Sequence, residues 1–190
     1  MTQNNDSVDG PNSDDAQANN AALIADADHA WKLLALVNEW IRHADAKATA
    51  GLAFTGALGT LLYNLVKNQS DAGIALNTFT VLAVISLGFA LLFCGLTLTP
   101  RIKVSDANPE SINKIFFASI AENYKDGQLE YRDVLKTLTE DPAALISDLA
   151  DQIHANAEIA TIKSRHTQYA IRFVLGAGVL IGAVAALVAN

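Results

Sequence analysis

The chain has 190 residues, of which 51% are hydrophobic and only 17% are charged. Soluble domains usually carry about 25% charged residues, and here the deficit is concentrated in long uncharged stretches. The formal net charge of -7 argues against a nucleic-acid-binding surface, because such a surface needs a dense basic stripe. The single cysteine, Cys94, excludes an internal disulfide.

The first part of the chain is polar and then becomes amphipathic. Residues 1–22 are rich in Asn, Asp, Ser and Gln and lack the basic start and apolar core of a signal peptide. This composition predicts a disordered tail, since it buries too little surface to offset chain entropy. In residues 23–98, apolar side chains such as Leu34, Val37 and Ile41 recur at helical spacing. No breaker precedes the first apolar run, so one continuous helix is expected.

Three uncharged runs are long enough to cross a bilayer. They cover residues 48–66, 76–98 and the end of the chain, where the segment 169–190 contains the uncharged run 173–189. A helix rising 1.5 Å per residue needs about 20 apolar residues to cross the hydrocarbon core. The sequence therefore predicts an all-α integral membrane protein with three transmembrane helices and a helical segment, residues 99–168, between spans two and three.

The segment 99–168 carries several helix boundaries. Pro100 should end the second span. Asn108-Pro109 predicts the start of a helix that ends near Tyr124, because it combines a capping side chain with proline at the first turn. Residues 125–127 read as a turn, and residues 129–138 as a short helix. Asp141-Pro142 repeats the start signal for a last helix that continues into the third span.

The charges beside the spans predict the orientation. Lys and Arg precede span one, follow span two and precede span three, whereas the loop between spans one and two offers only Lys67. By the positive-inside rule, the N-terminus and residues 99–168 should be cytoplasmic. We therefore expect a multi-pass protein of the cell inner membrane.

One group of candidate functional residues lies at the foot of the first span. Asp45 and Lys47 sit at the expected water–membrane boundary, and Asn38 and Arg42 precede them on the same helix. These side chains could bind a ligand or couple a cytoplasmic event to the span. The alternative is simple anchoring at the interface, with the Lys47 side chain reaching the headgroups.

A second group precedes the third span. Gln152, Asn156 and Lys163 are four and seven residues apart, which places them on one stripe of a helix. Amide groups could read the edge of a nucleobase while a lysine meets a phosphate. The alternative is a polar contact between helices, most simply with the segment 38–47.

The sequence offers no recognisable catalytic or metal site. The four histidines have no metal-ligand spacing such as HExxH, and no nucleophile or phosphate-binding motif occurs. We therefore expect neither enzyme activity nor a metal or other cofactor.

Two segments resemble the signatures of a known family, the transmembrane Pycsar effectors. The segment 36–48 resembles the N-terminal signature, with Asp45-Ala46-Lys47 as its acid–Ala–Lys at the foot of the first span. The segment 151–163 resembles the second signature, a glutamine, a polar residue four positions on and a lysine before the last span. The order of two spans, helical insert and final span is also similar.

The resemblance implies an anti-phage function. In that family a partner pyrimidine nucleotide cyclase makes cyclic CMP or cyclic UMP after infection. The effector responds to this activating ligand and impairs the inner membrane, which causes abortive infection. Because three spans per chain are too few to line a wide pore, we expect a homo-oligomer in the lipid bilayer.

Two alternatives remain open at the level of sequence. The protein could be a non-enzymatic membrane scaffold or signalling adaptor, or an ungated, holin-like lytic protein. A transporter is disfavoured because the spans contain no ionisable residue.

Overall fold

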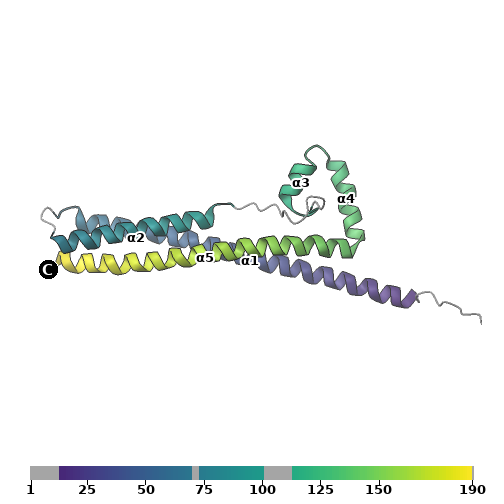
Figure 1. Ribbon diagram of the computed structural model, residues 1–190, viewed down its shortest axis with the longest axis horizontal. Helices are drawn as coiled ribbons and strands as arrows, with labels where there is room; N and C mark the ends of the chain where they lie inside the picture. The colour runs from purple at the N-terminus through teal and green to yellow at the C-terminus, as the bar shows by residue number, and fades with distance from the viewer. Residues whose placement is uncertain (1–12, 70–72, 101–112, 190) are drawn as a thin grey trace, which may run out of the picture. The chain divides into compact units, whose positions relative to one another are not determined.

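The computed structural model describes residues 13–69, 73–100 and 113–189, with side chains from Ala21 onward. Helix is the only regular secondary structure within these residues and no strand occurs among them, which confirms the predicted all-α class. The five helices are α1 (Ser13–Val66), α2 (Ile74–Leu98), α3 (Phe117–Asn123), α4 (Gln128–Glu140) and α5 (Pro142–Ala189) (Figure 1).

Most predicted helix boundaries are confirmed. α1 and α5 each run without a break into an apolar run, α2 ends two residues before Pro100, and residues 125–127 separate α3 from α4. Asp141 caps α5 as predicted: its Oδ1 accepts hydrogen bonds from the backbone N–H groups of Ala143 and Ala144, both at 3.1 Å. These features depend on a few neighbouring residues, so local sequence predicts them.

Part of the predicted disordered tail and part of the helix predicted from Asn108 to Tyr124 differ from the structure. α1 begins at Ser13, so residues 13–22 are helical; alanines at four of these positions favour helix, and extending an existing helix costs less than nucleating one. Residues 1–12 and the predicted start at Asn108-Pro109 lie outside the described residues. Residues 113–116 are not helical, because Asn113 Oδ1 accepts hydrogen bonds from the N–H groups of Ile115 (3.1 Å) and Phe116 (3.0 Å). This local turn competes with helix.

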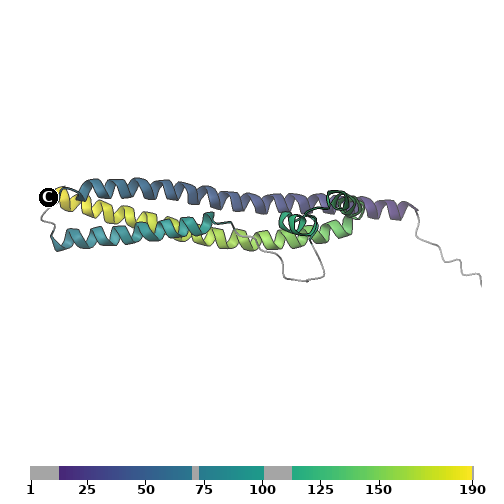
Figure 2. The same cartoon turned by 90° about the horizontal axis from the view of Figure 1, so that it is seen from above.

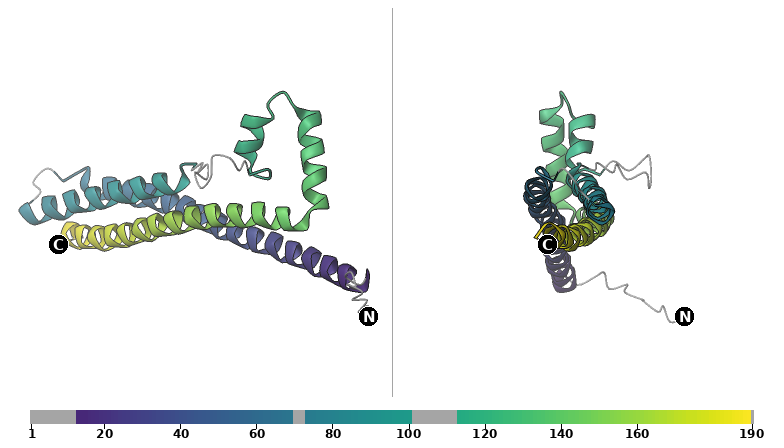
Figure 3. Two further views of the ribbon diagram at one scale, coloured as in Figure 1. Left: turned by 45° about the vertical axis from the view of Figure 1, so that its right-hand side comes forward. Right: turned by 90° about the vertical axis from the view of Figure 1, so that its left-hand side faces the viewer.

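The chain divides into two compact units, which are described separately. One comprises Met1–Ala35 and Val104–His154. In it, α3 and α4 lie side by side and α4 turns sharply into α5 (Figure 3). Asn113 Nδ2 donates to the backbone oxygen of Asp148 at 2.8 Å, and the Tyr131 hydroxyl donates to that of Lys114 at 3.0 Å. These bonds join the segment before α3 to the start of α5 and to α4.

The second unit, Leu36–Lys103 and Ala155–Asn190, is a three-helix bundle. α1 and α5 run parallel and α2 runs antiparallel to them (Figures 1 and 2), so that Val66, Ile74 and Ala189 lie at the same end. Most buried positions recur three, four or seven residues apart along each helix, the pattern of coiled-coil packing. The buried positions are Val37, Ala44, Ala48, Thr55 and Leu62 on α1; Leu76, Ala83, Ser86, Leu87, Ala90, Cys94 and Thr97 on α2; and Ala160, Lys163, Thr167, Ala170, Ala177, Ile181 and Val184 on α5.

Small residues and aromatic contacts hold α2 in the bundle. A Cβ added at Gly51 of α1 would lie 3.2 Å from the Cys94 sulfur, so the glycine permits close approach of α1 and α2. Against α5, the Ser86 hydroxyl donates to the backbone oxygen of Phe173 at 2.9 Å. The Phe93 ring centroid lies 5.7 Å from that of Phe173 and 5.2 Å from that of Tyr169.

The outer surface of this bundle suits lipid. α1, α2 and α5 are each long and apolar enough to cross a membrane, and their runs 48–66, 74–98 and 173–189 contain no Asp, Glu, Lys or Arg. Large apolar side chains face outward, among them Phe54 (65% exposed), Leu175 (66%) and Val179 (75%). In water such a surface would be unfavourable, whereas in a bilayer it contacts hydrocarbon. The prediction of three membrane helices is confirmed.

Candidate functional site between α1 and α5

Two side-chain pairs join α1 to α5 just before the apolar runs. Asn156 Nδ2 donates to Asn38 Oδ1 at 2.8 Å, and Lys163 Nζ donates to Asp45 Oδ1 at 2.6 Å. We call these two pairs the polar pairs. Both join residues 118 positions apart in the chain, so the helices are parallel and keep one register over two helical turns. A polar residue within an otherwise apolar helix seam specifies register in this way.

The Asp45–Lys163 pair is mostly shielded from water. The Lys163 side chain is 7% exposed and that of Asp45 is 35% exposed. One turn further along α5, the Thr167 hydroxyl lies 2.9 Å from the backbone oxygen of Lys163 and 3.4 Å from that of Ala44. A buried ammonium group is stable only when it is paired and hydrogen-bonded. The Lys163 ammonium group is therefore committed to Asp45 in this state of the protein.

The remaining predicted site residues have different surroundings. Arg42 forms an exposed ion pair with Glu39 on its own helix. Gln152 lies in the other unit, one turn before Asn156 on α5. Lys47 has no hydrogen-bond or ion-pair partner among the described residues. The structure thus shows the inter-helix contact that was the alternative reading for Asn156 and Lys163, and the ligand-binding role of all seven residues stays a prediction.

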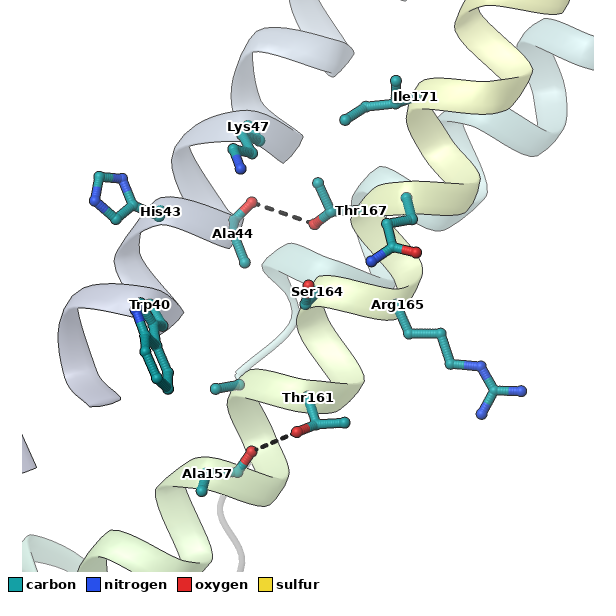
Figure 4. Close-up of a pocket in the computed structure, with 12 residues that line it drawn as sticks. Trp40, His43, Ala44, Lys47, Ala157, Thr161, Ser164, Arg165, Thr167 and Ile171 are labelled. Atoms are coloured by element: carbon teal, nitrogen blue, oxygen red, sulfur yellow. Dashed lines mark hydrogen bonds between the residues drawn. The ribbon is translucent and has the colours of Figure 1, made fainter. Parts of the chain in front are cut away.

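A groove of about 830 Å³ lies beside the polar pairs, also between α1 and α5 (Figure 4). Small-molecule sites are typically about 300–1,000 Å³. Its lining residues are Trp40, His43, Ala44 and Lys47 from α1, and Ala157, Ala160, Thr161, Ser164, Arg165, Thr167, Gln168 and Ile171 from α5. The alanine side chains in this lining are small, so they leave space between the two helices for the groove.

The polarity of the groove favours an anion. Lys47, Arg165 and His43 supply the titratable groups of its lining, and none of the lining residues is a carboxylate. Like Lys47, Arg165 makes no ion pair within the part of the chain that the structure describes. Trp40 is 56% exposed, so its ring is accessible to a planar group. The groove can therefore hold an anion and stack an aromatic ring at the same time.

Sequence reasoning missed most of this groove. Of the lining residues, only Lys47 was a candidate in the sequence, whereas Thr161, Ser164, Arg165 and Gln168 were not. The available signal was the alternation of three- and four-residue spacings along both helices. Reading it as a coiled-coil seam would have aligned residues 38–47 with 156–165 and shown which side chains flank the seam.

The fold and this site define a class: an all-α membrane protein whose polar helices join membrane helices directly and carry an anion-compatible groove at the junction. The family model described as PycTM, Pycsar effector protein domain, matches residues 29–190. The chain therefore belongs to the transmembrane Pycsar effector family, which confirms the resemblance seen in the sequence. It is an anti-phage effector with membrane character, and the family is not a known enzyme class.

A curated relative supports the same assignment. The chain is 29% identical over 168 residues to the Pycsar effector protein PtPycTM of Propioniciclava tarda, and the match covers 84% of this chain and 83% of the relative. No solved structure matches the chain.

Proposed function

We propose that this chain responds to cyclic CMP or cyclic UMP made by a partner pyrimidine nucleotide cyclase, and then impairs the inner membrane so that infection is abortive. The observation that carries the proposal is the family match over residues 29–190. The three apolar helices and the anion-compatible groove support it. The protein acts without enzymatic chemistry: the nucleotide is a signal and is not consumed.

The response requires a ligand that distinguishes two states of the protein. A ligand that binds both states equally shifts nothing, however tightly it binds. Within the three-helix unit, α1 and α5 carry both the polar pairs and the membrane runs. A ligand that contacts both helices can therefore change their spacing at the membrane boundary, because each helix is continuous from the site into its span.

The proposal includes orientation and assembly. The polar N-terminal segment and the insert between spans two and three face the cytoplasm, where the nucleotide is made. Copies of the chain associate in the inner membrane, since three helices cannot enclose a wide pore. Some of the outward-facing apolar side chains then contact lipid, and others contact neighbouring copies of the chain.

The proposal is tested in cells that carry the protein without a phage. Addition or synthesis of cyclic CMP or cyclic UMP should depolarise the inner membrane and stop growth, and cyclic AMP serves as the matched control. The same nucleotides should release dye from vesicles that contain the purified protein. A membrane potential that stays intact with both pyrimidine nucleotides would rule out the proposed response.

Two other functions give different results in this experiment. An ungated, holin-like protein would kill cells on expression alone, without any nucleotide. A scaffold or signalling adaptor would leave the membrane potential unchanged and copurify with a stoichiometric soluble protein. Nucleotide-dependent depolarisation of healthy, growing cells excludes both.

A further inference from the structure

We infer that the groove between α1 and α5 is the site of the cyclic pyrimidine nucleotide, with the base stacked on Trp40 and the phosphodiester held by Lys47 and Arg165. This inference rests on the proposed function for the class of ligand. The position of the site comes from the groove alone.

The charge of the groove favours an anionic ligand. The chain as a whole has a net charge of -7, yet the lining of this groove contains cationic groups and no carboxylate. Another hollow, of about 420 Å³ in the other unit, has three carboxylates in its lining, Glu130, Asp133 and Asp141, and one lysine, Lys114. An anionic phosphodiester would be repelled there, so the groove between α1 and α5 is the better site.

The cations near the groove differ in whether they have a partner within the described part of the chain. Lys163 is bonded to Asp45 and Arg42 to Glu39, so both are neutralised within the protein. Lys47 and Arg165 have no such partner in the described ranges. A bound phosphodiester would supply one. Arg165 lies on the outer rim and extends away from α1 in Figure 4, so its flexible side chain must turn inward on binding.

The distance between the Trp40 ring and the Lys47 charge matches the shape of a nucleotide. Trp40 and Lys47 are seven residues apart on α1, which places them on one face and about 10 Å apart along the helix axis. A nucleotide also carries its aromatic ring and its charge at opposite ends. On α5, Ser164 and Gln168 also line the groove, and neither makes a hydrogen bond within the described part of the chain. They are available to the sugar hydroxyl and to the polar edge of the base.

A lipid headgroup shares the phosphodiester chemistry but fits less well. Its phosphate could meet Lys47 near the membrane boundary. It has no ring for Trp40, which lies two turns further from the first span. The full length of the groove therefore favours a nucleotide.

The test uses the full-length protein in phosphatidylcholine nanodiscs. The chain has two tryptophans, so Trp31→Phe leaves Trp40 as the only one. Cyclic CMP or cyclic UMP should quench its fluorescence, whereas Trp40→Phe, which retains Trp31, should show no quenching. Lys47→Gln and Arg165→Gln should each weaken binding about tenfold or more, because each removes a charge-assisted contact. Calorimetric titration of the nucleotide measures the loss.

Matched control variants remove one positive charge elsewhere. Lys67→Gln lies in the short loop, and Arg132→Gln removes a side chain on α4 that is 74% exposed. Both should bind the nucleotide as the unmodified protein does. Circular dichroism of each variant checks that it is folded, and the Trp40 quenching tests the site without any change to its cations.

The outcomes separate the site from the function. If the unmodified protein binds nucleotide but Trp40 is not quenched and Lys47→Gln binds equally well, the site is wrong and the proposed function stands. If the unmodified protein binds neither nucleotide, both proposals fail. If Trp40 responds only when phosphatidylglycerol replaces part of the phosphatidylcholine, the groove is a lipid site and the inference is overturned.

Discussion

The Asp45–Lys163 pair predicts an unequal response to the loss of either partner. Asp45→Asn leaves the Lys163 ammonium group, whose side chain is 7% exposed, without a counter-charge. Breaking a buried pair in this way costs about 3–5 kcal/mol. The 35% exposure of the Asp45 side chain lets some water reach the site, so we expect the lower end, about 3 kcal/mol.

The converse change should cost less. Lys163→Met keeps an unbranched apolar stem and leaves Asp45, whose partial exposure allows water to replace the ammonium group. We expect a loss of about 1.5–2 kcal/mol, the lower part of the range for a hydrogen bond to a charged group. The double variant should lie within about 1 kcal/mol of the unmodified protein, because removing both charges also removes both desolvation costs.

The measurement is a double-mutant cycle on unfolding of the protein in detergent, followed by helical circular dichroism. Two results would refute the reasoning. Losses below about 0.5 kcal/mol for both single variants would mean that the pair behaves like an exposed surface ion pair. Additive losses in the double variant would mean that the two side chains do not interact directly.

Three further predictions concern register, close packing and capping in the same protein. Replacing Asn38 and Asn156 together with leucine should raise the thermal unfolding temperature, because a polar pair in a helix seam is retained at a cost in stability; crosslinking of cysteines on α1 and α5 should then show a second register. Gly51→Leu should destabilise by about 1–3 kcal/mol, because its Cβ meets the Cys94 sulfur at 3.2 Å; the control, Gly56→Leu, has nothing within 4 Å and should unfold near the unmodified temperature. Asp141→Ala removes the cap of α5 and should cost about 1 kcal/mol, measured by the same unfolding, and Asp141→Asn should restore most of it.

The groove was beyond local sequence reasoning for a clear reason. Lys47 and Lys163 are both lysines beside a span, and their neighbours along the chain do not distinguish them. The structure does, because Lys163 meets an aspartate 118 positions away and Lys47 meets none in the described residues. The start of α3 was missed on a smaller scale, since the Asn113 turn depends on which of two competing sets of hydrogen bonds the backbone adopts.

The amino-acid sequence alone determined the local features of the chain. These are the three uncharged runs long enough to cross a bilayer, the cap at Asp141, the turn at 125–127 and the end of α2 before Pro100. Each depends on residues a few positions apart, where hydropathy and backbone propensity act directly. Only the tertiary structure decided which polar side chains neutralise one another between α1 and α5 and which remain available to a ligand. That choice depends on the register of two helices more than a hundred residues apart, and packing of the whole seam sets this register.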